Sequence, residues 1–129
     1  MGDTPGLSEP ASSIEELVKD YASSRIFLNT STISPVPTSL LEAMACECAI
    51  VSTATCMIPE IIEHGVNGFI SNNEQELREH LVTLLNDEDL STKMGKRARQ
   101  TVLEKFSEKK FVETWKGVLN RASECFFKG

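Results

Sequence analysis

Residues 38–70 read TSLLEAMACECAIVSTATCMIPEIIEHGVNGFI, and this stretch decides the fold class. It opens with strong helix formers at residues 40–45, for which Thr38 or Ser39 is the expected cap. The short apolar run at residues 49–52 predicts a buried strand. After a short helix at residues 59–63 and a turn at residues 65–68, residues 69–70 predict another strand. Helices and strands therefore alternate, which is typical of parallel β-α-β units.

The flanking sequence continues this alternation. Upstream, Ser13 is the expected cap of a helix, and the apolar run at residues 25–29 predicts a first strand. Downstream, apolar residues at helical spacing predict three amphipathic helices, the last of them capped by Ser107. Their stripes are Leu77, Leu81, Leu84 and Leu85; then Leu90, Met94, Ala98 and Val102; then Phe111, Trp115, Val118 and Ala122. The prediction is an α/β protein with about three parallel strands and five to six helices.

Size, composition and charge exclude several classes of protein. The chain has 129 residues, 25% of them charged, and a net charge of −6, which argues against a nucleic-acid partner. No apolar run could span a bilayer, and the first residues do not resemble a signal peptide. Residues 1–87 hold 3 Lys or Arg and 13 Asp or Glu, whereas residues 88–129 hold 10 and 6. The basic tail allows two interpretations. Its mixed charges favour a pair of solvated helices, and the alternative is peripheral contact with a membrane.

The cysteines and histidines do not form a recognisable metal motif. Cys46 and Cys48 are the only close pair among the four cysteines, and their spacing is too tight for a usual zinc knuckle. We therefore expect no metal site, and we expect free thiols in a reducing compartment, which is the cytoplasm. Neither histidine has a Ser or Cys neighbour that would indicate a hydrolase triad.

The loop between the first predicted strand and the next helix is the candidate site. Pro35 and Pro37 exclude a helix or a central strand, and ligands in parallel sheets bind beyond the carboxyl ends of the strands. We therefore expect the site in loops 30–38 and 53–58. A helix start presents free N–H groups to a phosphate, Thr38 and Ser39 add hydroxyls, and Glu42 could accept hydrogen bonds from a sugar. Plain helix capping, with Glu42 as a first-turn acid, explains the same residues equally well.

The motifs in this stretch resemble those of a known family. The helix containing LEAMA at residues 41–45, the strand at 49–52, the Pro-Glu step at 59–62 and the turn at 65–70 look like the donor-binding half of retaining GT-B glycosyltransferases of the group 1, or family 4, type. The resemblance runs from about residue 13 to residue 119. It implies an irregular loop at residues 1–12 and an incomplete, nucleotide-sugar-binding Rossmann-like domain at residues 13–129.

The resemblance also implies roles for individual residues. Glu42 corresponds to the second glutamate of the family's pair, which contacts the ribose hydroxyls, and the first falls on Ser34. The implied substrate-binding residues are Ser34, Val36, Thr38, Ser39 and Glu42, with no catalytic residue secured and no metal or other cofactor required.

Several positions depart from the family pattern. Ser34 cannot supply the negative charge of the family's first glutamate, and Pro35 and Pro37 remove N–H groups where the family has glycines. Glu47 and the pair Cys56-Met57 also stand where the family has glycine, so Glu47 would adopt left-handed geometry at a cost of about 1 kcal/mol.

The functional expectation is the donor-binding portion of an enzyme that transfers a hexose-type sugar with retention. Complete members have two Rossmann-like domains and hold the diphosphate with an Arg and a Lys, so we expect the chain by itself to bind donor weakly and to be inactive. We also expect an open strand edge that pairs with an N-terminal half or with a second copy. The alternative is a non-catalytic α/β binding or assembly module. A receiver-like signalling domain is disfavoured because Asn29, Thr30 and Ser52 provide no acidic cluster at the strand ends.

Overall fold

The computed structural model describes residues 10–127. Residues 10–12 contain no helix or strand, and the rest of the expected N-terminal loop, residues 1–9, lies outside the described residues. The described chain contains six helices and three strands. They are α1 (Ile14–Ser23), β1 (Ile26–Asn29), α2 (Thr38–Ala45), β2 (Ala49–Ser52), α3 (Ile58–Ile61), β3 (Phe69–Ile70), α4 (Glu74–Asn86), α5 (Glu88–Lys105) and α6 (Glu108–Phe127).

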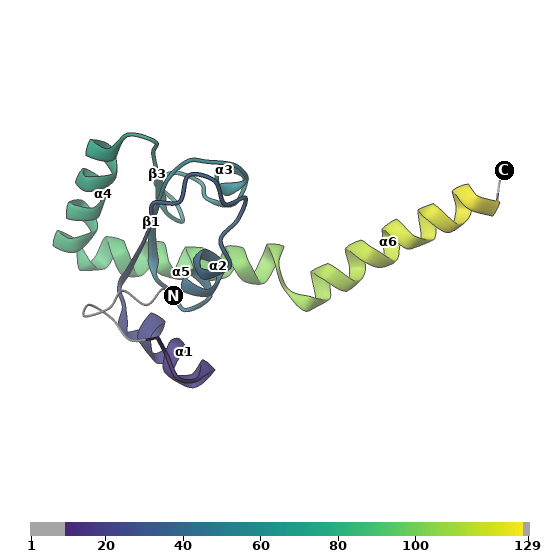
Figure 1. Ribbon diagram of the computed structural model, residues 1–129, viewed down its shortest axis with the longest axis horizontal. Helices are drawn as coiled ribbons and strands as arrows, with labels where there is room; N and C mark the ends of the chain where they lie inside the picture. Colours follow the sequence, from purple (N-terminus) through teal and green to yellow (C-terminus); the bar gives the residue numbers. More distant parts are fainter. Residues whose placement is uncertain (1–9, 128–129) are drawn as a thin grey trace.

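The three strands form one parallel sheet in the order β1-β2-β3 (Figure 1). Ile26 pairs with Ala49 across β1 and β2, and Val51 pairs with Phe69 across β2 and β3. Because all strands run in the same direction, their carboxyl ends meet at one edge of the sheet. The predicted α/β class and parallel arrangement are confirmed.

Helices cover both faces of the central strand, which explains why β2 is apolar throughout. Ile50 faces one core cluster, with Leu40 and Met44 of α2 and Ile58 of α3. Ala49 and Val51 face the other cluster, whose buried members also include Leu77, Leu84 and Met94 of α4 and α5. A strand buried on both faces reads as a continuous apolar run, as in a parallel sheet.

Helix α5 crosses the connection between α2 and β2 at a glycine. A Cβ on Gly95 would collide with the carbonyl oxygen of Glu47, so only glycine permits this crossing. Nearby, Nη1 of Arg99 donates a hydrogen bond of 2.5 Å to the carbonyl oxygen of Ala45 and so stabilises the end of α2. Glu47 itself has φ 65°, the left-handed geometry that its correspondence to a glycine predicts.

Two helix boundaries differ from the predictions. Helix α2 begins at Thr38, its N-cap is Pro37, and no side chain caps it, so the predicted capping by Thr38 or Ser39 is wrong. The reason is that Pro37 has extended geometry and its carbonyl oxygen already accepts from the Leu40 amide. Helix α3 spans Ile58–Ile61 rather than residues 59–63, because Ile62 has extended geometry.

The two predicted side-chain caps are confirmed. Oγ of Ser13 accepts a hydrogen bond of 3.1 Å from the Glu16 amide at the start of α1. Oγ of Ser107 accepts one of 3.3 Å from the Lys110 amide at the start of α6. Each hydroxyl satisfies an amide that has no partner within its own helix.

Candidate functional site

The loops that follow β1 and β2 lie side by side at the carboxyl edge of the sheet, joined by hydrogen bonds. Nδ2 of Asn29 donates to Oγ of Ser52 at 2.9 Å, and Oγ1 of Thr55 donates to the carbonyl oxygen of Ser31 at 3.2 Å. The amide of Met57 donates to the carbonyl oxygen of Pro35 at 3.2 Å. Residues 30–38 and 53–58 therefore form one surface.

The loop after β1 leads directly into the N-terminus of α2. Thr38 is exposed and Ser39 is half-buried in the first turn of this helix. Free amides and the positive end of the helix dipole are properties of any helix start, and they favour an anionic group there. Ser34 in the loop and Glu42 in α2 are each half-buried.

The carboxylate of Glu42 already has a partner within the protein. The hydroxyl of Tyr21, on α1, donates a hydrogen bond of 3.1 Å to Oε2 of Glu42. Tyr21 is only 3% exposed, and burial first, with the neighbouring Glu42 second, raises the pKa of this phenol to about 12. The hydrogen bond orients the carboxylate at the first turns of α2. The sequence analysis predicted the helix that begins after Ser13 but did not identify Tyr21 as a neighbour of the site.

Two of the predicted site residues make contacts that limit their roles. The amide of Ser34 donates a hydrogen bond of 3.4 Å to Oγ of Ser31. This bond uses the main chain of Ser34 and not its hydroxyl. The side chain of Val36 is partly buried and packs against the core cluster beside α2.

A cavity of about 520 Å³ lies at the same edge of the sheet, on the α4 side, and the sequence analysis missed it. Thr30, Thr53 and Asn72, which closely follow the three strands, contribute polar groups to its wall. Its full lining is Leu28, Thr30, Thr32, Thr53, Asn72, Glu74, Leu77, Arg78 and Leu81. Arg78 is the basic residue of this wall. The feature of the sequence that could have indicated Arg78 is its position in the helix that follows the last strand.

One further position that departs from the family pattern, Cys56, has an unusual backbone conformation. Cys56 has φ 51°, and it stands where the family has the first glycine of a pair. Both Cys56 and Glu47 thus adopt the left-handed backbone conformation that glycine accommodates without steric cost.

Two further observations concern metals and membranes. Within residues 10–127, no three His, Cys, Asp or Glu residues are grouped so that they could hold a metal ion. None of the helices in that range combines the length and the apolarity needed to cross a bilayer.

A parallel sheet with helices on both faces and loops joined at its carboxyl edge defines a Rossmann-like α/β class of domain. Residues 10–101 match the family described as glycosyl transferases group 1. The chain belongs to this family, and its fold is that of the C-terminal domain of GT-B glycosyltransferases.

Individual relatives support the same placement. The chain is 37% identical over 81 residues to N-acetyl-alpha-D-glucosaminyl L-malate synthase of Bacillus anthracis, a match that covers 61% of this chain and 21% of that protein. The C-terminal domain of the group 1 glycosyl transferase LpcC from Francisella tularensis matches with a TM-score of 0.69 and 25% identity, over 78% of this chain and 53% of that one.

A third relative was solved with a nucleotide. Anabaena HepE in complex with UDP matches with a TM-score of 0.67 and 26% identity, over 81% of this chain and 30% of that one. The same protein was also solved with UDP-glucose. The chain thus spans about a fifth of the length of the curated relative named above and a third or less of HepE.

Proposed function

We propose that the chain is the donor-binding portion of a glycosyltransferase that takes a hexose-type sugar from a nucleotide donor with retention. The observation that carries the proposal is the surface formed by loops 30–38 and 53–58, which leads into the start of α2 with Glu42 one turn further on. In this proposal the helix start faces the diphosphate and Glu42 contacts ribose hydroxyls. No metal or other cofactor takes part.

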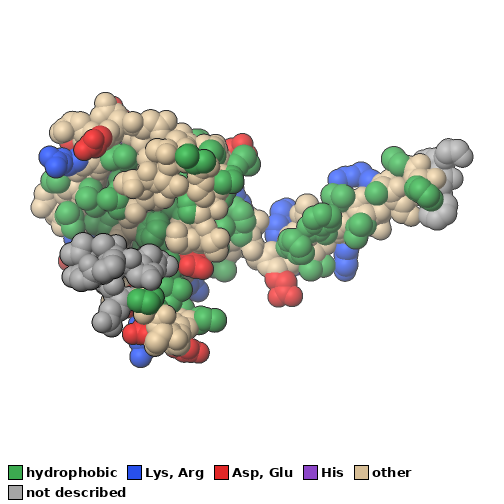
Figure 2. All heavy atoms as spheres, in the orientation of Figure 1, with side chains coloured by type: hydrophobic (Ala, Val, Ile, Leu, Met, Phe, Trp, Pro, Cys, Tyr) green, Lys and Arg blue, Asp and Glu red, His purple; other side chains and the backbone are tan. Residues whose placement is uncertain are grey.

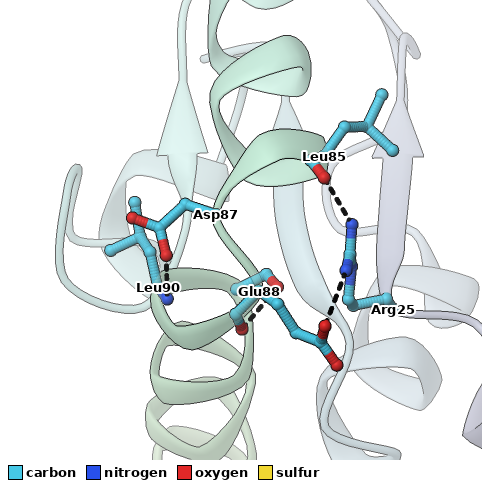
Figure 3. A network of polar contacts seen from close by, with 6 residues as sticks. Arg25, Leu85, Asp87, Glu88 and Leu90 are labelled. Carbon is cyan, nitrogen blue, oxygen red and sulfur yellow. Dashed lines mark hydrogen bonds and ion pairs between the residues drawn. The ribbon is translucent and has the colours of Figure 1, made fainter.

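The distribution of positive charge supports weak donor binding by this chain alone. Of the three basic residues in 1–87, Arg78 lies at the carboxyl edge, in the wall of the cavity. Arg25 precedes β1 at the opposite end of the sheet, where it donates to the carbonyl oxygen of Leu85 at 2.7 Å and lies 3.8 Å from Glu88 (Figure 3). Lys19 belongs to α1. A diphosphate would therefore meet little positive charge, and we expect no sugar transfer without a partner.

Calorimetric titration with UDP, UDP-glucose and UDP-N-acetylglucosamine tests the proposal, with GDP- and ADP-sugars as competitors. We expect Kd values of about 0.1–1 mM, which corresponds to roughly 4–5.5 kcal/mol of binding free energy. Glu42→Gln should weaken binding severalfold. Glu47→Gln is the matched control, because Glu47 follows the other end of α2, and it should leave affinity unchanged.

Two outcomes would contradict parts of this proposal. Micromolar affinity together with transfer by the chain alone would show that the charge argument is wrong. Equal effects of Glu42→Gln and Glu47→Gln on donor affinity would show that Glu42 does not contact the donor.

The second candidate is a non-catalytic α/β binding or assembly module, and Ser34 is the observation that favours it. A serine supplies no negative charge beside a developing positive charge on a sugar, and the prolines at 35 and 37 remove two amides from the loop. Ser34→Glu separates the two functions. The variant should increase donor affinity if the site is a glycosyltransferase site, and it should leave affinity unchanged in a module that lost the chemistry.

Location and partners complete the proposal. We place the protein in the cytoplasm, and the four free cysteines support a reducing compartment. The proposed partners are the nucleotide sugar and either an N-terminal half or a second copy of this chain.

A further inference from the structure

Tyr21 is the buried residue of α1, and it docks this helix on the body of the domain. Its ring packs near that of Phe27 on β1, with the two ring centroids 6.1 Å apart. Figure 2 shows charged side chains of α1 at the bottom of the view, on the side away from the body. The phenol of Tyr21 points the other way, into the protein and towards α2.

The Tyr21 hydroxyl is held in place because both ends of the residue are fixed. Its carbonyl oxygen accepts a hydrogen bond of 3.0 Å from the Ser24 amide and one of 3.2 Å from the fully buried thiol of Cys48. Its hydroxyl donates to Oε2 of Glu42. Burial first, and then Glu42, raises the pKa of the phenol to about 12, so the hydroxyl keeps its proton at neutral pH. Glu42 therefore meets a fixed donor.

The other carboxylate oxygen of Glu42 has no such partner. Among residues 10–127, no hydrogen bond or ion pair other than that from Tyr21 reaches the carboxylate, so Oε1 is without a protein donor in that range. Glu42 is half-buried and lies one turn after the start of α2, where loop 30–38 ends. An ionised carboxylate oxygen accepts hydrogen bonds from hydroxyl groups, and a side chain that is already held loses less conformational freedom when it binds them.

We propose that Tyr21 is a positioning residue of the donor site, which holds the Glu42 carboxylate so that Oε1 accepts from the ribose hydroxyls of the nucleotide. This inference rests on the proposed function, in which Glu42 contacts the ribose. A purely structural Tyr21 would only dock α1, and loss of its hydroxyl would not change how the site distinguishes ribose from deoxyribose. Preference for the ribonucleotide is therefore the property that Tyr21 controls.

Nucleotide titrations of the full chain, followed by NMR, measure this preference. The probes are UDP, GDP and ADP, each with its 2′-deoxy and 3′-deoxy counterparts. The discrimination ratio is the Kd of the deoxy form divided by the Kd of the ribo form. For the unmodified chain we expect a ratio of about five with the nucleotide that binds, which corresponds to one hydrogen bond.

Tyr21→Phe keeps the ring but releases the carboxylate. It should weaken binding of the ribo form about threefold and leave the deoxy forms unchanged, so the ratio should fall to about two. Glu42→Gln should lower the ratio to about one, because it removes the charged acceptor. The double variant Tyr21→Phe, Glu42→Gln should bind like Glu42→Gln alone, since Tyr21 acts through that carboxylate.

Thr101→Val is the matched control for the loss of a hydroxyl. Oγ1 of Thr101 accepts a hydrogen bond of 2.9 Å from Nδ2 of Asn67, in the turn before β3 and therefore at the amino end of that strand. The control should leave the discrimination ratio unchanged. Thermal denaturation of each variant establishes that it is folded at the temperature of the titration.

A second measurement needs no substitution at Tyr21, because it is the single tyrosine in the chain. Biosynthetic incorporation of meta-fluorotyrosine gives one fluorine resonance beside the hydroxyl. The ribo form should shift this resonance more than the deoxy forms do, and Glu42→Gln should remove the difference.

The outcomes distinguish this inference from the proposed function. An unchanged ratio in Tyr21→Phe together with a reduced ratio in Glu42→Gln would overturn the positioning role and leave the proposed function intact. Equal weakening of the ribo and deoxy forms in Tyr21→Phe would identify a structural role and overturn it as well. An unmodified chain that binds no nucleotide, or that binds both forms equally, would overturn the contact between Glu42 and ribose and the positioning role with it.

Discussion

The buried phenol of Tyr21 on α1 and the carboxylate of Glu42 on α2 are joined by a hydrogen bond of 3.1 Å. Tyr21 also accepts, through its carbonyl oxygen, a hydrogen bond from the Cys48 thiol, whose pKa burial raises to about 11. The contact therefore links α1, α2 and the start of β2 behind the candidate donor loop. It sets the position of the one carboxylate that the proposed function requires.

Because Tyr21 is the single tyrosine in the chain, its ionisation can be followed by absorbance alone. Burial and Glu42 raise its pKa from 10.0 to about 12. The folded state therefore keeps its proton while the unfolded state loses it, so this contribution to stability is complete below pH 10 and is lost as pH rises towards 12. An alkaline titration monitored through the tyrosinate band should give a midpoint near 12.

Glu42→Gln is the control for that titration. It keeps a hydrogen-bond acceptor but removes the negative charge, so the Tyr21 midpoint should fall while staying above 10, since burial remains. A wild-type midpoint of 10 would show that Tyr21 is solvated and not in contact with Glu42.

Gly95 should be intolerant of even the smallest side chain. In Gly95→Ala, the new Cβ would collide with the main-chain oxygen of Glu47, so α5 must move off the α2–β2 connection. We expect a loss of about 3 kcal/mol or more in the free energy of unfolding, measured by urea denaturation. Gly117→Ala is the matched control: nothing lies within 4 Å of its new Cβ, and a helical alanine should stabilise by about 0.5–1 kcal/mol. Equal stabilities of the two variants would contradict the close crossing.

The fold could be predicted because its local signals agree with its global arrangement. The continuous apolar run of β2, the caps at Ser13 and Ser107, and the alternation of elements all indicate a parallel sheet between helices. Helix α2 shows the limit of that reasoning. Hydroxyl residues at 38 and 39 indicate a cap, yet the extended Pro37 ends the loop one residue earlier.

The candidate site was predictable only in outline. The rule that ligands bind beyond the carboxyl ends of parallel strands placed loops 30–38 and 53–58 near each other. It could not reveal that Tyr21 contacts Glu42, because that contact joins residues 21 apart on different helices. Nor could it reveal the cavity beside Arg78, whose wall forms only when three strand ends and α4 come together.

Asn67 should be the most sensitive polar residue of the turn before β3. It is 5% exposed, its Nδ2 donates to the Ile61 carbonyl oxygen at 3.0 Å and to Oγ1 of Thr101 at 2.9 Å, and its Oδ1 accepts from the Glu63 amide at 2.7 Å. Asn67→Ala leaves buried main-chain groups without partners, so we expect a loss of about 2 kcal/mol in chemical denaturation. Thr101→Val removes one of these bonds and should cost less than half as much. A larger loss of stability in Thr101→Val than in Asn67→Ala would show that the hydrogen bonds of Asn67 are not what stabilises this turn.

The histidine pair should make stability depend on pH. His80 stacks on Phe69 with ring centroids 4.4 Å apart and lies 5.1 Å from His64. Burial first, then the neighbouring His64, lowers the pKa of His80 below its ordinary 6.5, although Glu76 and Glu79 act in the other direction. The unfolded state therefore binds the proton more readily, and the free energy of unfolding should fall as pH drops through 6.5.

Denaturation at pH 7.5 and 5.5 measures this dependence. His80→Phe keeps a ring on Phe69 but cannot bind a proton, so its stability should change less between the two pH values. Proton NMR of the two histidines checks the cause directly, and a His80 midpoint at or above 6.5 would rule it out.

The exposed edge of the sheet should drive association of the chain. Within residues 10–127, β1 pairs with β2 on one side and has no strand on the other, and Leu28 on this strand is 46% exposed at the wall of the α4-side cavity. Unpaired edges and open apolar faces favour pairing with another chain, so sedimentation should show concentration-dependent association at tens of micromolar. Leu28→Lys should shift the equilibrium towards monomer, because a charge on an edge strand opposes pairing, whereas Val82→Lys, at a similarly exposed site on α4, should not. A clean monomer for the unmodified chain at those concentrations would show that β1 is not a pairing edge.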